Sequence, residues 1–168
     1  VSRVRKSGFT FAPEAGSQRL RNVINKGFTE EDILGAVERA MESGWMGVKL
    51  YFMIGHPTET QEDLEEMVSL VRKIRSILAR FPGKRRVTVS VSPFVPKAFT
   101  PFQWERQDST EETRTKLSWL RKRLRGKGIE FRHHDVAATT IEGIISRAGR
   151  SAGDLIGDGW RRGARLDG

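Results

Sequence analysis

The chain has 168 residues, a length typical of a single domain. Hydrophobic residues make up 37% and charged residues 30%, which places the chain among ordinary globular proteins rather than disordered or membrane proteins. The absence of cysteine excludes disulfides, thiolate nucleophiles and any iron–sulfur cluster ligated by cysteines of this chain. No apolar run is long enough to cross a membrane, and the basic residues 1–6 precede no apolar signal segment. We therefore expect a cytoplasmic protein without membrane contact.

The charge balance is strongly basic. Thirty lysine and arginine residues stand against 21 aspartate and glutamate residues, which gives a formal net charge of +9. A surplus of this size favours phosphate-rich partners. The basic residues gather in residues 72–86 and 114–127 and at both ends. They fit either the solvated outer faces of helices, as most charge runs do, or a nucleic-acid-binding surface.

Strand-like and helix-like segments alternate from the beginning of the chain. Gly8–Phe11 is β-prone, and Ser17 then caps a helix that ends at Gly27. A capping-box pattern at Thr29 starts a second helix, which Gly44 stops. The apolar positions expected on the first helix are Leu20, Val23 and Ile24.

The middle of the chain repeats this pattern. Met46–Ile54 is an apolar run typical of a strand that is covered on both faces in a parallel sheet. A helix is expected from Thr60 to Phe81, and Val87–Ser92 alternates with period two as the next strand.

A proline-rich loop leads into the last βα unit. A helix begins at Ser109 or Thr110 and continues through Leu124, and Ile129–Phe131 is a short strand. From Thr139 the pattern weakens to short helices.

About four βα units imply a parallel sheet with right-handed crossovers. A closed eight-fold barrel needs about 250 residues, more than this chain has. We therefore predict an α/β protein, either a partial (half) TIM-type barrel or an open parallel sheet, with a short helical C-terminal tail. The expected division is residues 1–135 for the α/β core and 136–168 for the helical extension.

Three loops at the carboxyl ends of the predicted strands carry candidate site residues, because α/β proteins place their sites there. Residues 12–17 combine the carboxylate of Glu14 with a helix N-terminus suited to anions. Residues 54–60 let a ligand approach the backbone at Gly55, and residues 92–104 are stiff and aromatic.

Several of these side chains also have a purely structural interpretation. Glu14 and Glu59 are carboxylates at helix starts, where the helix dipole favours them. A histidine before proline, such as His56, is more often structural than a general base. His133 and His134 point in opposite directions on an extended chain, so no metal site is expected. Loop packing or a stacking platform would explain the aromatic residues Phe94, Phe99, Phe102 and Trp104.

Taken in order, Phe9–Ser17, Lys49–Thr60 and Val91–Trp104 resemble the C-terminal half of a radical S-adenosylmethionine (radical SAM) enzyme core. The resemblance extends over about Val4 to Phe131. Within that superfamily it is closest to proteins that place a cobalamin-binding domain before the radical core, and more distant to tRNA methylthiotransferases. Residues 141–150 and 163–168 also resemble the tail of the cobalamin-associated group, whose substrate is generally unassigned.

The resemblance implies cofactor-binding positions but no catalytic residue. One loop approaches the ribose or the methionine part of S-adenosylmethionine, a second brackets the adenine and is fixed by its terminal glutamate, and a third lies near adenine and substrate. His56 departs from the family pattern, where an aromatic or aliphatic residue is commoner. The implied positions are Glu14, Gly16 and Ser17 in the first loop, Ile54, Gly55 and Glu59 in the second, and Ser92, Pro93 and Phe94 in the third.

The family's three-cysteine cluster motif and its first three strands are absent from these 168 residues. Cleavage of S-adenosylmethionine needs an electron from a cysteine-ligated [4Fe–4S] cluster, so we expect a fragment that is inert alone. Its expected partners are the N-terminal half of the same polypeptide, with cobalamin if a cobalamin domain is present, and an RNA substrate. An open sheet edge also favours homo-oligomers. The alternatives are a non-catalytic RNA-binding domain and a structural domain that has lost its chemistry.

Overall fold

The computed structural model describes residues 7–164, so residues 1–6 and the last part of the tail resemblance, 165–168, lie outside the described part. Strands and helices alternate as the sequence predicts. The elements are β1 (Phe9–Glu14), α1 (Gln18–Val23), α2 (Glu30–Glu42), β2 (Gly47–Ile54), α3 (Gln61–Ala79), β3 (Arg86–Pro93), α4 (Thr110–Arg123), β4 (Ile129–His133), α5 (Val136–Ile145) and α6 (Ser151–Arg161).

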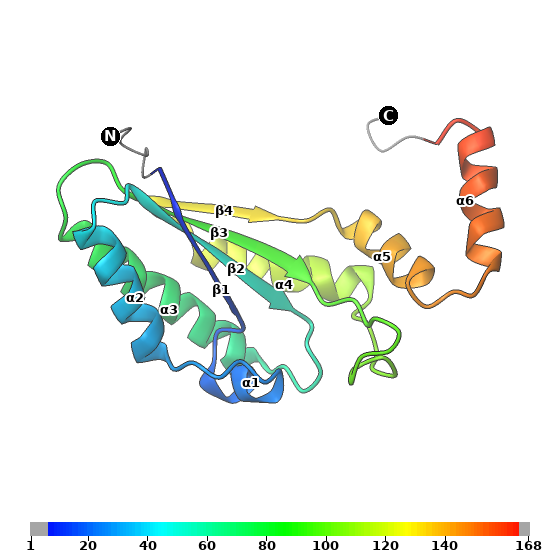
Figure 1. The fold of residues 1–168 in the computed structure, drawn as a ribbon, viewed down its shortest axis with the longest axis horizontal. Coiled ribbons are helices and arrows are strands. Elements are labelled where there is room, and N and C mark those ends of the chain that lie inside the picture. The colour runs from blue at the N-terminus through cyan, green and yellow to red at the C-terminus, as the bar shows by residue number, and fades with distance from the viewer. Residues whose placement is uncertain (1–6, 165–168) are drawn as a thin grey trace, which may run out of the picture.

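The strands form one open parallel sheet in the order β1-β2-β3-β4 (Figure 1). The register of β2, β3 and β4 is continuous, because Val48 pairs with Val87 and Val87 pairs with Ile129, whereas the pairing of β1 with β2 shifts between Phe11 and Glu14. The predicted α/β class with an open parallel sheet is therefore confirmed. All four strands end at one edge, where the three candidate loops leave the sheet.

The core lies on only one face of the sheet. Helices α2, α3 and α4 lie on that side (Figure 1), and Leu50 and Phe52 of β2 are almost fully buried there. Lys49, Tyr51 and Met53, which alternate with them, are only partly buried. The prediction that this strand is covered on both faces is wrong for the described chain, since the opposite face carries amphipathic side chains that tolerate water.

Helix starts follow the local sequence signals closely. Thr29, Thr60 and Ser109 each form a capping box at the start of α2, α3 and α4. Ser17 caps α1 as predicted, but that helix ends at Val23, before Gly27.

The buried face of α1 also differs from the prediction. Val23 is 39% exposed, whereas Arg21 is 1% exposed. The Arg21 guanidinium donates to the carbonyls of Ala15 and Gly16, so its charge supports the loop between β1 and α1. An apolar spacing rule cannot identify such a residue.

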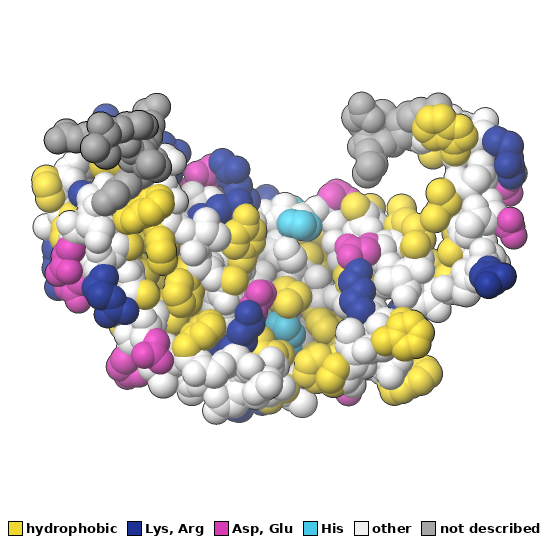
Figure 2. All heavy atoms as spheres, viewed as in Figure 1, with side chains coloured by type: hydrophobic (Ala, Val, Ile, Leu, Met, Phe, Trp, Pro, Cys, Tyr) yellow, Lys and Arg dark blue, Asp and Glu magenta, His cyan; other side chains and the backbone are white. Residues whose placement is uncertain are grey.

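The two C-terminal helices differ in how they pack. Val136 of α5 joins the core, and the Gln107 side chain donates to the Thr139 carbonyl. No residue of α6 is buried, and α6 projects away from the sheet in Figure 1. Hydrophobic side chains are visible on the surface of this projecting arm in Figure 2. Between residues 7 and 164, no helix has the length and hydrophobicity that a membrane span requires.

Candidate functional site

A cavity of about 470 Å³ opens at the carboxyl ends of β2, β3 and β4. This volume lies within the range of small-molecule sites. Phe94 and Phe102 meet edge to face in its wall, with ring centroids 6.1 Å apart. The structure brings the predicted residues Ser92, Pro93 and Phe94 together in this cavity. Its other lining residues are Met53, Val95, Lys97, Thr100, Phe102, His134, Thr139 and Glu142.

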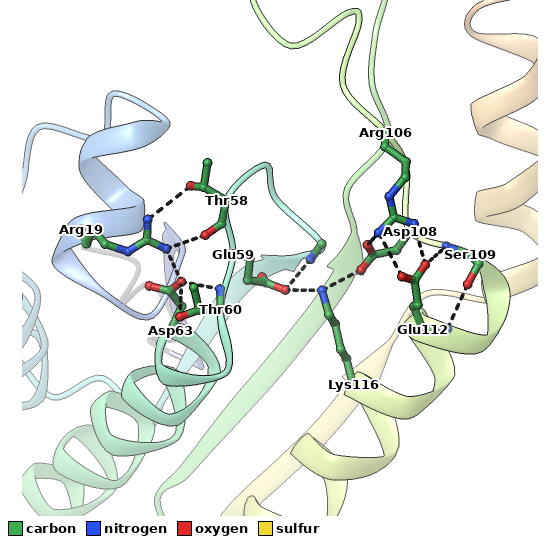
Figure 3. Close-up of polar contacts among 11 residues, drawn as sticks. Arg19, Thr58, Glu59, Thr60, Asp63, Arg106, Asp108, Ser109, Glu112 and Lys116 are labelled. Atoms are coloured by element: carbon green, nitrogen blue, oxygen red, sulfur yellow. Dashed lines mark hydrogen bonds and ion pairs between the residues drawn. The ribbon is translucent and has the colours of Figure 1, made fainter.

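The loop after β2 is closed by one carboxylate. Glu59 accepts a hydrogen bond from the Gly55 amide at 2.8 Å, which is the loop-fixing contact expected of this glutamate (Figure 3). Gly55 has φ +79, a backbone conformation that residues with a side chain rarely adopt, and a Cβ there would lie 2.7 Å from Asp108. This loop therefore requires both the glycine and the glutamate.

Lys116 of α4 connects this loop to the segment before α4. Its ammonium group lies 2.7 Å from a carboxylate oxygen of Glu59 and 2.7 Å from one of Asp108 (Figure 3). Burial raises the pKa of the Glu59 carboxyl, against the opposing effect of Lys116. Burial alone would lower the pKa of Lys116, but its hydrogen bonds to Asp108 and Glu59 raise it. The ammonium group therefore stays charged between the two carboxylates.

A second polar cluster fixes the start of α3 beside the same loop. Arg19 of α1 donates to Asp63 and to the Thr58 carbonyl, and Asp63 also accepts from the Thr60 amide (Figure 3). Burial tends to raise the pKa of Asp63, but its hydrogen bonds with Arg19, Ser17 and Thr60 outweigh burial and lower it. The loops after β1 and β2 are thereby joined.

Three predicted site residues make contacts that hold the loops after β1 and β2 in place. The Ser17 hydroxyl donates to Asp63 and accepts from the Leu20 amide, so it already has a hydrogen-bond partner both as donor and as acceptor. A Cβ on Gly16 would lie 2.3 Å from the Met67 amide nitrogen, so Gly16 permits the loop to approach α3. Ile54 is buried in the core, and its carbonyl accepts from the Phe94 amide at 2.8 Å.

Glu14 and His56 lie at the same edge of the sheet. Glu14 follows a register shift in β1, has φ +65, and has a carboxylate 3.6 Å from the Lys26 ammonium group. His56 is 5% exposed and stacks at an angle on Phe94, with ring centroids 5.6 Å apart. Burial lowers the pKa of His56, which keeps the ring neutral near pH 7.

Buried polar atoms without a partner gather at this edge. By hydrogen-bond distance and angle, neither ring nitrogen of His56 nor the Oε2 atom of Glu59 has a partner within residues 7–164, although the Glu14 backbone lies close enough to the His56 ring to oppose the lowering of its pKa. Such atoms carry a desolvation cost of about 1–3 kcal/mol each unless a ligand or water satisfies them. The edge is therefore chemically suited to a polar ligand.

The remaining aromatic and histidine residues separate into different surroundings. Phe94 and Phe102 pack in the cavity wall, whereas Phe99 and Trp104 are 98% and 90% exposed. The Nε2 atom of His133 accepts a hydrogen bond from the Arg121 guanidinium at 2.6 Å, and His133 lines a different cavity from His134. The described residues contain no group of three or more possible ligands placed to hold a metal ion.

Sequence reasoning missed Lys97, Asp108, Lys116 and Glu142. Lys97 and Glu142 form an ion pair that joins the third loop to α5 at the rim of the cavity. Asp108 and Lys116 belong to a loop and a helix far along the chain from Gly55. No local signal marks these residues, because their role depends on contacts between distant segments.

The model of the Radical SAM superfamily matches residues 2–71 of this chain. That range contains the first two candidate loops, with Glu14, Gly55 and Glu59, and ends within α3.

The chain is also similar to curated proteins. It is 38% identical over 138 residues to an uncharacterized protein of Methanocaldococcus jannaschii, a match that covers 82% of this chain and 29% of that protein. A tRNA-2-methylthio-N(6)-dimethylallyladenosine synthase of Aquifex aeolicus is 32% identical over 63 residues, covering 37% of this chain and 14% of the synthase.

The synthase of the same name from Wolbachia pipientis subsp. Culex pipiens is 24% identical over 146 residues. This match covers 86% of the chain and 31% of the synthase. The chain thus spans less than a third of the length of these relatives, and the similarity to the Wolbachia pipientis protein extends well beyond residues 2–71.

Proposed function

We propose that this chain is the C-terminal part of a radical SAM enzyme core and contributes one side of the S-adenosylmethionine and substrate site. The observation that carries the proposal is the meeting of three loops, in the family's order, at one edge of the sheet beside a cavity of about 470 Å³. The superfamily match over residues 2–71 supports the same assignment.

The residues at this edge fit S-adenosylmethionine. The cavity has aromatic walls for a planar ring, and Gly55 permits the close approach of Asp108 that shapes the loop after β2. The unpartnered atoms of His56 and Glu59 supply polar groups for a ligand. In this proposal Glu14 and Gly16 lie near the ribose or methionine part, and Ser17 acts by positioning Asp63. The remaining cofactor-binding positions are Ile54, Gly55, Glu59, Ser92, Pro93 and Phe94.

The same residues do not fit an iron–sulfur cluster, because the sequence has no cysteine. A [4Fe–4S] cluster supplies the reducing electron in radical SAM chemistry, and its ligands must come from outside these 168 residues. The N-terminal part of the core is thus a proposed partner. This chain's own contribution is to bind and orient the cofactor and to limit the access of water.

The names of the relatives favour an RNA substrate, since two of those cited above are named as tRNA-modifying synthases. None of the cited names or descriptions mentions cobalamin, and cobalamin has no place in the proposal. We further propose that the α/β core ends near Asp135, with residues 136–168 as a helical extension. Association between copies through the open edge of the sheet remains part of the proposal.

Nuclear magnetic resonance of the ¹⁵N-labelled chain titrated with S-adenosylmethionine tests the cofactor assignment. The expected chemical-shift changes fall on the amides of Ser92, Phe94 and Val95, which line the cavity, and on those of residues 54–59 other than Pro57, since His56 packs on Phe94. Phe94→Ala should lower the affinity at least tenfold, since it removes a wall of the site.

Phe99→Ala is the matched control, because Phe99 belongs to the same loop but is 98% exposed. This variant should bind like the unaltered chain, and thermal melts of both variants establish that each is folded. Shift changes scattered away from the carboxyl edge, or an equal loss of affinity in both variants, would contradict the assignment.

A further inference from the structure

A groove separates α3 from α4 on the side of the molecule opposite the open face of the sheet. It has a volume of about 420 Å³ and contains one aromatic ring, that of Trp119. The groove is rich in positive charge, with three cationic residues against one acidic residue. Its lining residues are Glu65, Val68, Ser69, Arg72, Lys73, Ser76, Trp119 and Arg123.

The cations around this groove largely lack acidic partners. Elsewhere, ion pairs neutralise exposed cations, such as Arg80 with Glu38 and Arg106 with Glu112. Lys73 at the groove is paired with Glu30. Within the described chain, the cations of α3 and of residues 122–127 that form no ion pair with a carboxylate are Arg72, Arg75, Lys122, Arg123, Arg125 and Lys127.

Local contacts hold several of these cations in place. Arg72 donates to the Arg123 carbonyl at 3.2 Å, and Arg75 donates to the Lys127 carbonyl at 3.0 Å. The Arg123 guanidinium lies 4.9 Å from the centre of the Trp119 ring. These contacts use carbonyl oxygens and a ring face, so the positive charges are ordered but not neutralised.

We propose that the groove between α3 and α4 binds the sugar–phosphate backbone of an RNA. Ordered cations without acidic partners attract phosphates and release counterions on binding. A protein partner would need matching carboxylates and apolar contacts, whereas this groove is lined mainly by charged and hydroxyl side chains. The choice of RNA rests on the proposed function.

The position of the groove is compatible with that function. Helix α4 begins at Thr110, next to Asp108 at the cofactor edge, and ends at Arg123 in the groove. Its 14 residues span about 21 Å at 1.5 Å per residue. An RNA arm that lies along α4 can therefore bind the groove and still reach the edge with the cavity.

Fluorescence anisotropy with a labelled RNA hairpin tests the proposal on the folded chain. The double variant Arg72→Gln with Arg123→Gln removes two charges from the groove. We expect at least a tenfold loss of affinity at 100 mM salt, and a decrease of about 2 in the slope of log affinity against log salt. The variant Arg72→Lys with Arg123→Lys keeps both charges and should retain most of the affinity.

The control variant Arg150→Gln with Arg161→Gln makes the same change in net charge at the two ends of α6. It should bind RNA within threefold of the unaltered chain. Equal losses in the groove and control variants, or no loss in either, would overturn the proposal. Binding to phosphatidylserine vesicles instead of RNA would also overturn it, because the groove would then serve a membrane surface.

The S-adenosylmethionine titration separates this proposal from the proposed function. RNA binding that depends on the groove in a chain that ignores S-adenosylmethionine would uphold the groove and reject the radical SAM assignment. Cofactor binding without RNA binding at the groove would reject the groove alone.

Discussion

Lys116 is one cation that forms ion pairs with two carboxylates. The Glu59 side chain is 2% exposed and that of Asp108 is 12% exposed, so water solvates neither well. Taking charges out of water is costly, and the paired ammonium group offsets that cost only while both ion pairs are formed. The loop after β2 thus depends on a residue 57 positions away from Glu59 in the sequence.

Replacing this cation tests the arrangement at the scale of one residue. Lys116→Met should lower the free energy of unfolding by about 2–4 kcal/mol, because it leaves the buried Glu59 carboxylate without a counter-charge and Asp108 with only the longer ion pair to Arg106. The pKa of Glu59 should rise further, since the neighbouring positive charge is lost. Urea unfolding measures the first effect, and carboxyl ¹³C titration measures the second.

Lys122→Met on the same helix is the control for this experiment. Lys122 is exposed, and no ion pair or hydrogen bond of its side chain is found in the described structure. Its substitution should change stability by less than about 0.5 kcal/mol. A similar cost for both variants would refute the role of Lys116 as the bridging charge.

Helix α3 is the element around which the site loops are arranged. Its first turn receives Arg19 and Ser17 through Asp63, and its Met67 backbone lies against Gly16. Because the contact with Gly16 involves backbone atoms of α3, a side-chain movement cannot relieve added bulk there.

Gly16→Ala should therefore destabilise the protein by about 1–3 kcal/mol, the usual cost of overpacking. A Cβ at this position would lie 2.3 Å from a backbone nitrogen. Gly27→Ala is the comparison, because nothing lies within 4 Å of the corresponding Cβ. Thermal and urea unfolding of both variants should differ clearly, and a neutral Gly16→Ala would contradict the close approach.

At this scale, local sequence signals predict the elements well. The capping-box pattern at Thr29 and the helix start expected at Ser109 or Thr110 mark the starts of α2 and α4 correctly, and the alternation in Val87–Ser92 marks β3 to within one residue at each end, because each signal depends on residues a few positions apart. Arg21 and Lys116 could not be assigned, because burial of a charge depends on carbonyls or carboxylates brought from elsewhere in the fold. The loop that contains Phe94 was predictable from the sequence, but the cavity that it lines together with α5 was not.

The whole molecule combines a one-sided core with an appended helix. The buried apolar residues lie between the sheet and helices α2, α3 and α4, whereas α6 has no buried residue. Leu155 and Ile156 of α6 are 59% and 54% exposed. The stability of the described chain should therefore be independent of the apolar face of α6.

The double variant Leu155→Ala with Ile156→Ala should change the free energy of unfolding by less than about 1 kcal/mol, since both side chains are exposed. Leu120→Ala in α4 should cost about 2–5 kcal/mol, because Leu120 is fully buried in the core. Urea unfolding at one temperature compares them. A large cost for the α6 variant would mean that this helix packs against the body of the protein.

The order of the strands in the sheet has a consequence for synthesis on the ribosome. Each new strand joins the edge formed by the strand before it, so β1-β2-β3-β4 is both the spatial order and the order of emergence. No strand has to be inserted between two others. The sheet can therefore grow during translation. Each completed βα unit leaves the edge of its strand open, and the next strand to emerge pairs with that edge.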